Sequence, residues 1–326
     1  MSSSTERSKR QNIPGGAPPG LSPGVWVVAT PIGNLSDMTE RGRLALEHAH
    51  WIACEDTRRT RALLSALSIS ASDPLGGSRL RRYDRHTAPT LVRQWIQEIK
   101  QSGASIAVVS DAGTPAISDP GALLVQVAHE EGVAVTPVPG PSAVAALLSV
   151  SGWPEAESFG FLGFLPRSEA AVRESIERLL QWAQIAGRPW VSVWFESPER
   201  IETTLRWISE CLDPSRAVEI CVCKELTKIH ERLFRGAPSE VWAQVRREVE
   251  AEGALGEWAL AIRFPGVDAA REQPASDLEW MKALECLLDA EVKTSECARI
   301  LSHRFGVSRE KAYALAMDIK KRRRGG

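Results

Sequence analysis

The sequence lacks several features that mark common protein classes. Its six cysteines are scattered and form no C-x-x-C pair, which argues against a disulfide framework and against a cysteine zinc site. We therefore expect reduced thiols and no bound metal. No apolar run reaches about 18 residues, so no membrane span is expected. The 40 Lys and Arg residues balance 41 Asp and Glu residues, so net charge alone does not indicate a nucleic-acid partner.

Three sequence signatures of common enzyme classes are also missing. No G-x-G-x-x-G run follows the first predicted strand, and no G-x-x-x-x-G-K-[ST] loop occurs in the chain. The zinc-protease signature H-E-x-x-H is absent as well. These absences weigh against nicotinamide-dependent, P-loop and zinc-protease functions.

The length of 326 residues exceeds what one compact core usually holds, since a domain has about 100–200 residues. Residues 1–24 are rich in Ser, Pro and Gly and have no apolar segment of the kind found in secretion signals, so they predict a disordered leader. Residues 265–276 carry Pro, Gly and polar side chains and predict a linker. We expect a cytoplasmic protein.

Apolar runs suited to strands alternate with amphipathic windows between these two segments, which predicts an α/β fold with parallel or mixed sheets. The pattern divides into two α/β domains, residues 25–152 and 153–264. Strands are predicted at Val25–Ala29, Trp51–Cys54, Ile106–Val109, Val133–Val138, Trp190–Phe195, Ala217–Cys223 and Trp258–Arg263. Helices are predicted at Thr39–His48, Asp56–Leu67, Gly121–Glu131, Pro141–Val150, Ser168–Gln184, Pro198–Cys211 and Ser239–Glu250.

Residues 277–326 predict a small helical domain. Its last helix has apolar residues at helical spacing and Ser308 as a possible N-cap. A helix, a turn at Gly306 and a second helix resemble a helix-turn-helix, although a bundle packed on the main body fits equally well. The chain ends in a basic tail, Lys320–Arg324, which suits either a phosphate contact or a solvated helix end.

Three loops that follow predicted strands of the first domain are rich in Pro and Gly. They are Thr30–Leu35, Ser110–Gly121 and Pro137–Ala143. In open α/β sheets, ligands bind at the carboxyl ends of the strands. Rigid loops there hold backbone N–H and C=O groups in place at little entropic cost, which suits a flat heterocyclic ligand, although ordinary turns explain any one loop alone.

The second domain contributes Phe195–Arg200 at one strand end and Lys224–Glu231 at another. In the latter segment Glu225, Lys228 and His230 place acid, base and cation close together. Such groups could move a proton, or they could form a salt-bridged strand end. A lysine acts as a base only when burial or a neighbouring cation lowers its pKa, so Lys228 as the base is a hypothesis.

Several motifs in order resemble the tetrapyrrole-methylase family, and among its branches the 16S rRNA cytidine 2′-O-methyltransferases. These runs are Val28–Leu35, Cys54–Arg58, Ser110–Gly121, Pro139–Ala143, Phe161–Pro166, Glu196–Pro198 and Glu225–Lys228. The resemblance covers residues 25–263, and the C-terminal helices are similar to the small domain of this branch. It implies two α/β domains with a cleft between them, a homodimer, and S-adenosylmethionine (SAM) bound in the cleft.

The resemblance also assigns roles to residues. It implies that SAM contacts Pro31, Gly33, Gly113, Thr114, Ile117, Ser142 and Ala143. It places Glu225, Thr227, Lys228 and Glu257 on the second-domain side, with Lys228 and Glu225 as the candidate catalytic residues. The substrate implied is a cytidine ribose in the decoding region of 16S rRNA, so the expected partner is the small ribosomal subunit.

The chain departs from the family pattern at two places. His86-Thr87-Ala88 stands where the family usually has His-Asn-Glu, and Leu255 stands where it usually has Lys. Either change could reduce activity if the missing carboxylate or lysine handles a proton or a phosphate in relatives. Two other functions therefore stay open: a tetrapyrrole C-methyltransferase, and a non-catalytic ribosome-binding protein that retains a SAM-shaped pocket.

Overall fold

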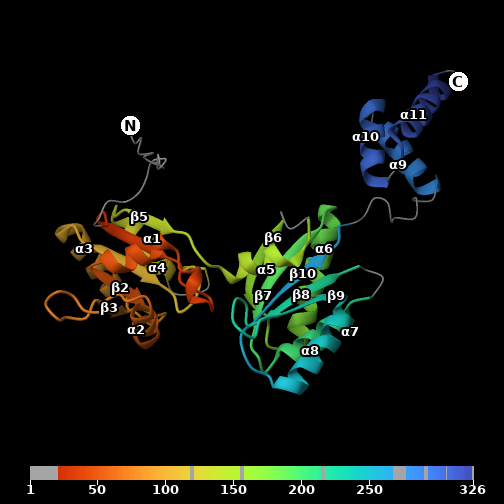
Figure 1. Cartoon of the computed structure of the whole chain (residues 1–326). Helices are drawn as coiled ribbons and strands as arrows, with labels where there is room; N and C mark the ends of the chain where they lie inside the picture. The colour runs from red at the N-terminus through yellow and green to blue at the C-terminus, as the bar shows by residue number, and fades with distance from the viewer. Residues whose placement is uncertain are drawn as a thin grey trace, which may run out of the picture. The chain divides into compact units, whose positions relative to one another are not determined.

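The computed structural model describes residues 21–117, 121–154, 158–213, 217–266, 277–289, 293–305 and 307–324 (Figure 1). Its contacts divide the chain into two compact units. The first consists of Met1–Ala146 together with Glu225–Glu231, and the second consists of Leu147–Lys224 and Arg232–Gly326. The predicted leader, apart from its last residues, and nearly all of the predicted linker lie outside the described residues.

The first unit contains a fully parallel five-stranded sheet. Its strands are β1 (Gly24–Val28), β2 (Trp51–Cys54), β3 (Leu80–Arg82), β4 (Ser105–Val109) and β5 (Val135–Val138), in the order β3-β2-β4-β1-β5. Strand β4 is buried along its whole length and β1 almost so, as expected for central strands covered on both faces. Because all five strands run the same way, their carboxyl ends lie at one edge of the sheet.

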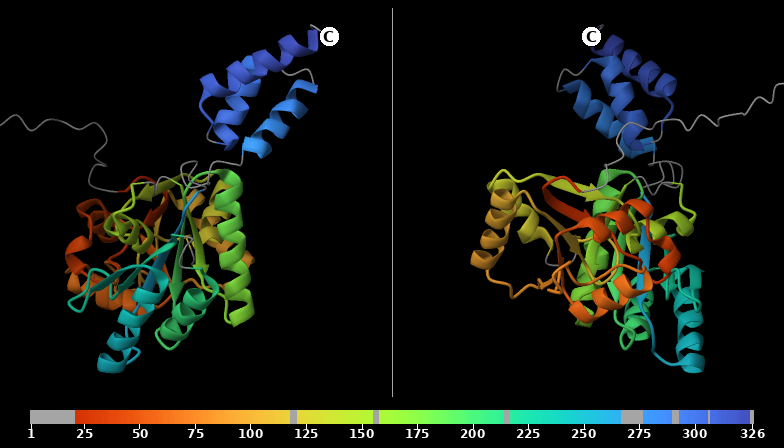
Figure 2. Two further views of the ribbon diagram at one scale, coloured as in Figure 1. Left: turned by 90° about the vertical axis from the view of Figure 1, so that its right-hand side faces the viewer. Right: turned by 60° about the vertical axis from the view of Figure 1, so that its left-hand side comes forward.

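Helices cover both faces of this sheet, which gives the unit two hydrophobic clusters (Figure 2). The helices are η1 (Leu35–Asp37), α1 (Glu40–His48), α2 (Thr57–Ala66), α3 (Pro89–Ser102), α4 (Gly121–Glu130) and α5 (Ala143–Ser151), the last of which spans the boundary between the units. Leu46 of α1 and Leu64 of α2 pack in one cluster, and Ile96 of α3 and Leu124 of α4 pack in the other. The alternation of strands and helices therefore produces the predicted α/β fold, and in this unit the sheet lies between two layers of helices.

Tyr83, directly after β3, ties that strand end to α4. Its ring is buried against Trp95 at a centroid separation of 6.2 Å. Its hydroxyl accepts a hydrogen bond from the Leu124 N–H at 3.0 Å, in the first turn of α4.

The second unit contains a mixed five-stranded sheet. Its strands are β6 (Phe159–Phe164), β7 (Trp190–Glu196), β8 (Glu219–Lys224), β9 (Arg232–Gly236) and β10 (Trp258–Phe264), in the order β6-β7-β10-β8-β9. Only β6 and β7 pair in parallel; the other neighbours are antiparallel. Helices α6 (Glu169–Ala186), α7 (Ile201–Cys211) and α8 (Pro238–Glu252) share one core with the sheet.

Three helices close the described chain: α9 (Asp277–Asp289), α10 (Thr294–Phe305) and α11 (Arg309–Arg324). They have a separate core, in which Trp280, Leu284, Leu301 and Ala312 are buried. The Ser308 hydroxyl accepts a hydrogen bond from the Lys311 N–H at 3.2 Å, as expected of an N-cap. The predicted helical C-terminal region is thus confirmed, whereas Gly306 and the side chains of residues 321–324 lie outside the description.

Five elements were not predicted from the sequence, namely the short helix η1 and β3, α3, β6 and β9. One helix also begins later than expected: α7 starts at Ile201 and not at Pro198, because the preceding residues form a turn in which the Arg200 N–H donates to the Ser197 carbonyl. The parallel-or-mixed alternative is resolved, since one sheet is parallel and the other mixed. Among the described helices, none is long and apolar enough to cross a membrane.

Candidate active site

The loop after β1 is bound to the loop after β4 at the carboxyl edge of the parallel sheet. Thr30 and Gly113 exchange two backbone hydrogen bonds, Thr30 N–H to Gly113 O at 2.9 Å and Gly113 N–H to Thr30 O at 3.1 Å. The Thr30 hydroxyl lies 3.3 Å from the Ser110 carbonyl oxygen. Gly113 has φ +80°, a left-handed conformation that a side chain would strain. The two loops are therefore joined to each other. We call the joined loops at this edge of the sheet the ledge.

The loop after β5 joins the same ledge. The Thr114 hydroxyl donates to the Pro141 carbonyl at 3.1 Å, which ties the second loop to the third. Ser142 then begins α5, where its carbonyl accepts from the Ala146 N–H at 2.9 Å. All three Pro/Gly-rich loops are thus connected within one unit, although their strands are separated along the chain.

A fourth segment reaches this ledge from elsewhere in the sequence. Chain order assigns residues 225–231 to the second domain, but their contacts group them with the first unit. A Cβ added to Gly33 would overlap the Lys228 side chain, and it would lie 2.9 Å from the Thr227 hydroxyl oxygen and 3.0 Å from the Leu226 carbonyl. The absence of a side chain at Gly33 therefore leaves the space into which this segment packs. Glu225 and Thr227 have φ values of +53° and +67°, so the segment is held in a sparsely populated backbone conformation.

The Thr227 hydroxyl is a buried polar group that lacks a partner. Its oxygen is inaccessible to solvent, and no hydrogen-bonding group of the described chain reaches it. Leaving such a group unsatisfied costs about 1–3 kcal/mol, so these groups are uncommon unless a ligand or water completes them. This hydroxyl is covered by the Gly33 loop, so it belongs to the contact between that loop and residues 225–231.

Lys228 and Glu225 form an ion pair in the same segment. Their Nζ and Oε1 atoms are 2.7 Å apart, and their side chains are 27% and 20% exposed. The Lys228 N–H also donates to the Glu225 carbonyl at 2.9 Å. The pair therefore offers a carboxylate that can accept a proton and an ammonium that can hold an anionic or hydroxyl oxygen, side by side.

Lys224, the last residue of β8, fixes the point where this segment leaves the second sheet. Its side chain is 4% exposed, and its Nζ lies 2.7 Å from Glu248 and 2.9 Å from Glu252, both on α8. Burial by itself would lower the pKa of Lys224, but the hydrogen bonds that its ammonium donates to the two glutamates outweigh burial and raise this pKa. The hydrogen bond from Lys224 lowers the pKa of Glu252. Sequence reasoning missed Lys224 as an anchor, because nothing local marks the α8 glutamates as its partners.

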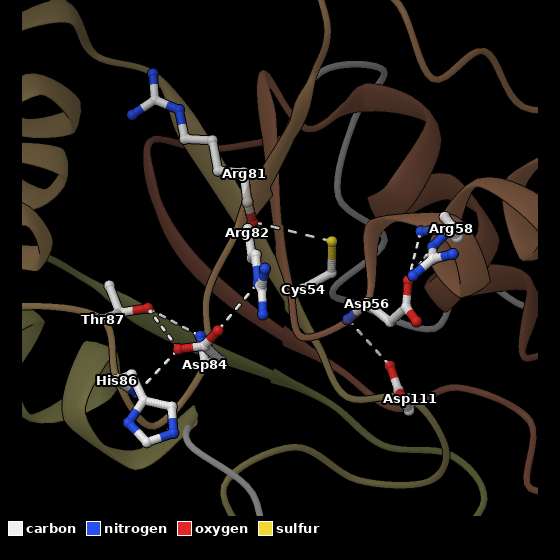
Figure 3. Close-up of polar contacts among 9 residues, drawn as sticks. All are labelled: Cys54, Asp56, Arg58, Arg81, Arg82, Asp84, His86, Thr87 and Asp111. Atoms are coloured by element: carbon white, nitrogen blue, oxygen red, sulfur yellow. Dashed lines mark hydrogen bonds and ion pairs between the residues drawn. The ribbon is translucent and has the colours of Figure 1, made fainter.

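A second group of charged residues lies where β2, β3 and β4 end (Figure 3). Asp56 caps α2 through a hydrogen bond from the Arg58 N–H at 2.7 Å. This backbone bond lowers the pKa of Asp56. Asp111, after β4, accepts from the Asp56 N–H at 3.3 Å and lies 3.2 Å from Arg59. The Cys54–Arg58 motif is therefore tied to the second loop.

The altered His86-Thr87-Ala88 run has a clear structural role. Asp84 accepts from the His86 N–H at 2.9 Å, which lowers the pKa of Asp84, and the Asp84 N–H donates to the Thr87 hydroxyl at 2.9 Å (Figure 3). Thr87 therefore takes part in a closed turn. Ala88 caps α3 without a side-chain hydrogen bond, so the carboxylate expected there has no substitute on that residue.

The structure brings together most of the residues expected to form the site. Gly113 and Thr114 lie on the ledge, Gly33 seats Lys228, and Ser142 and Ala143 open α5. Ile117 is 51% exposed, and the next three residues of its loop lie outside the described chain. Glu257 belongs to the second unit, as does Leu255, which is 66% exposed and whose carbonyl accepts from the Trp258 indole.

The fold and this site define a class of protein. The model of the tetrapyrrole (corrin/porphyrin) methylases matches residues 24–241, which is well over half of the chain. The chain therefore belongs to the tetrapyrrole-methylase family, and the resemblance drawn from its motifs is confirmed. Among solved structures, the methyltransferase CobJ aligns with a TM-score of 0.50 at 16% identity over 74% of this chain and 94% of that one. A diphthine synthase aligns with a TM-score of 0.51 at 11% identity over 74% and 89%. These likenesses confirm the fold.

Curated relatives specify a branch of that family. A protein from Mycobacterium tuberculosis is 37% identical over 90% of this chain and 94% of its own length. One from Thermotoga maritima is 40% identical over 72% and 96%, and one from Escherichia coli O157:H7 is 33% identical over 90% and 94%. All three are named ribosomal RNA small subunit methyltransferase I.

Proposed function

We propose that this protein transfers a methyl group from SAM to the ribose 2′-oxygen of a cytidine in the decoding region of 16S rRNA. The observation that carries the proposal is the ledge of three loops on which residues 225–231 rest through Gly33. Family membership and the names of relatives that align over most of the chain support the same reaction. Those names also favour it over a tetrapyrrole substrate.

The ledge provides what SAM needs from a binding site. We assign its contacts to Pro31, Gly33, Gly113, Thr114, Ile117, Ser142 and Ala143, as the motifs predict. When bound there, SAM supplies the electrophilic methyl group. The rigid loops orient their main-chain groups in advance, so little entropy is lost on binding.

The Glu225–Lys228 pair is placed to deal with the proton of the ribose hydroxyl. When the 2′-oxygen bonds to the methyl carbon, the bond between that carbon and the sulfur of SAM would break, and the hydroxyl proton would have to go to a base. The Glu225 carboxylate accepts that proton in our proposal, while the Lys228 ammonium holds the 2′-oxygen in line. A positioned base contributes about 10²–10⁴-fold in rate, and correct orientation adds more.

The substrate and its setting follow from the chemistry. A ribose can enter a protein site only if its nucleotide is single-stranded or splayed out of a helix. We therefore propose that the partner is the small ribosomal subunit, and that the protein acts in the cytoplasm as a homodimer.

The test is methylation mapping. Small subunits from cells that lack this protein are incubated with the protein and labelled SAM, and the modified nucleotide and its atom are located. Methyl transfer to a cytidine 2′-oxygen is expected, whereas C-methylation of a precorrin would identify the tetrapyrrole alternative. Lys228→Met and Glu225→Gln should reduce kcat while calorimetric SAM binding persists. SAM binding without any turnover on subunits would instead indicate a non-catalytic ribosome-binding protein.

A further inference from the structure

Exposed arginines gather at the carboxyl edge of the parallel sheet, beside the ledge. Helix α2 contributes Arg58, Arg59 and Arg61, and the chain at the end of β3 contributes Arg82 and Arg85. All five are exposed, and the side chains of Arg58 and Arg82 are 90% and 75% accessible. We call these five residues the arginine edge.

The strand register explains why the two segments meet. Strands β2 and β3 are parallel neighbours in which Cys54 pairs with Arg82, so the chain leaves both strands at the same edge. Figure 3 shows Arg82 and Arg58 on either side of Cys54. Burial raises the pKa of the Cys54 thiol, and the charge of Arg61 is close enough to oppose that rise.

The charge at this edge differs from that of the whole chain. The net charge of the protein is −1, but the segments 55–61 and 80–87 carry six arginines and three carboxylates. Two of those carboxylates, Asp56 and Asp84, already accept backbone hydrogen bonds that shape their loops. The edge is therefore a local concentration of positive charge in an otherwise neutral protein.

The guanidinium groups keep donors available for a partner. Arg82 lies 3.0 Å from Asp84 and Arg59 lies 3.2 Å from Asp111, but each such pair is exposed and engages only part of a group with five N–H donors. Arg61 and Arg85 form no ion pair with a carboxylate in the part of the chain that the structure describes. Nothing in the described fold requires either of these two arginines.

We propose that the arginine edge binds phosphates of the single-stranded RNA that flanks the target ribose. This inference rests on the proposed function and names the surface by which that substrate is held. Guanidinium groups bind phosphate bidentately, and several of them along one edge can follow a backbone. The edge and the ledge end the same parallel sheet, so both belong to one unit.

The experiment uses the double variant Arg61→Ala/Arg85→Ala in the full-length protein. Affinity is measured for a protein-free single-stranded RNA of the target segment and for unmethylated small subunits, between about 50 and about 200 mM salt. Each lost phosphate contact should reduce the slope of log K against log salt by about 0.7, so the double variant should lose about 1.4. KM for subunits should rise, while kcat and the calorimetric affinity for SAM stay at wild-type values.

Two further variants serve as controls. Arg61→Lys/Arg85→Lys keeps both charges and should retain most of the salt slope. Arg178→Ala/Arg247→Ala removes two exposed arginines from α6 and α8 of the second unit and should leave the slope unchanged.

The inference is overturned if the alanine variant binds RNA with the wild-type salt slope. It is also overturned if that variant binds subunits more weakly but protein-free RNA normally, since the edge would then contact a ribosomal protein. Failure of the proposed function looks different: the wild-type protein would bind SAM and RNA without methylating a ribose, and the salt slope would still measure the phosphate contacts.

Discussion

The two sheets of this protein have the same number of strands but offer very different places for a ligand. In the parallel sheet every strand ends at one edge, so the loops after β1, β4 and β5 can be joined by Thr30, Gly113 and Thr114. In the mixed sheet the neighbours β7, β10, β8 and β9 alternate in direction, which distributes their ends over both edges. Strand direction therefore determines that the first unit carries the ledge.

The mixed sheet contributes to the candidate site through the one segment that follows β8, and not through the ends of several strands. Residues 225–231 leave β8, rest on the ledge of the first unit and return to β9. Lys224 fixes their departure by its buried contacts with α8. A sheet with alternating strand directions can thus still supply a segment of the candidate site, provided that the start of that segment is held firmly.

Gly33→Ala should have the largest effect, because it separates that segment from the parallel sheet. The backbone of Gly33 is not in the left-handed region, so alanine is tolerated locally, but its Cβ would collide with Lys228 and Thr227. A displacement of about 1 Å near the reacting groups can reduce turnover about 100-fold, and we expect a loss of that size in kcat/KM.

Gly76→Ala is the matched control for that experiment. Gly76 has φ +85° but open space around it, so alanine there introduces backbone strain of about 1–2 kcal/mol without a collision. Its kcat/KM should equal that of the wild type. Normal turnover in Gly33→Ala would contradict the role that we assign to Gly33, which is to leave space for residues 225–231.

Lys224→Met should have the next largest effect and tests the anchor in the mixed sheet. Removing one member of a buried ion pair costs about 3–5 kcal/mol, which we reduce to about 2–3 kcal/mol because the Glu252 side chain is 45% exposed. Urea unfolding measures this loss. Lys224→Arg should recover part of it, and Lys100→Met, at an exposed position, should change the free energy of unfolding by less than about 0.5 kcal/mol.

The loss in Lys224→Met should also depend on pH in a defined direction. The folded pKa of Glu252 is lowered, so its contribution is present above the ordinary glutamate value of about 4.3 and disappears as the pH falls through the lowered value. The folded pKa of Lys224 is raised, so its contribution is lost only as the pH rises above about 10.4. The difference between variant and wild type should therefore be constant from about pH 5 to pH 10, and a difference that grows in acid would refute the anchor.

Tyr83→Phe tests the parallel sheet at the start of α4. The phenyl ring keeps the packing against Trp95 but removes the acceptor for the Leu124 N–H. A typical intramolecular hydrogen bond contributes about 0.5–1.5 kcal/mol, and we expect a loss of about 1 kcal/mol in thermal or urea unfolding. The other tyrosine of the chain, Tyr313, is 45% exposed, so Tyr313→Phe should have almost no effect.

Leu255→Lys should have the smallest effect. It adds a positive charge just before β10 and so tests whether the mixed sheet takes part in RNA binding. The side chain is 66% exposed, so the free energy of unfolding should change by less than about 0.5 kcal/mol. An exposed charge contact is worth up to about 1 kcal/mol, which limits the gain in RNA affinity to about fivefold. A larger gain would mean that the mixed sheet takes a greater part in RNA binding than its geometry indicates.

The sequence was sufficient to predict the α/β class, most strands and the C-terminal helices, because apolar runs and helical spacing record burial directly. It was insufficient for β3, a three-residue strand containing Arg81 and Arg82, and for β9, whose exposed Arg232 and Arg235 break the apolar pattern of a strand. These two are edge strands, which are covered by fewer neighbours and so carry little hydrophobic signal. Helix α3 did carry a signal, since Val92, Trp95, Ile96 and Ile99 share its buried face.

The site was predictable in a similar way. Pro and Gly mark where each loop bends, so Gly33 and Gly113 could be proposed from sequence alone. The contacts that join the loops could not, because Thr30 pairs with Gly113 only after the sheet has brought distant strands together. Likewise, no local pattern shows that Thr227 and Lys228 rest on Gly33 across nearly two hundred residues.

The composition of the first unit has a consequence for how the protein is made. Residues up to Ala146 leave the translating ribosome first, but residues 225–231 of the same unit follow only after β6, β7 and β8 have been synthesised. The nascent parallel sheet can form early, whereas its ledge stays incomplete until much of the second unit has emerged. A chain whose translation stops before Glu225 would therefore have the three loops without the segment 225–231 that completes their unit.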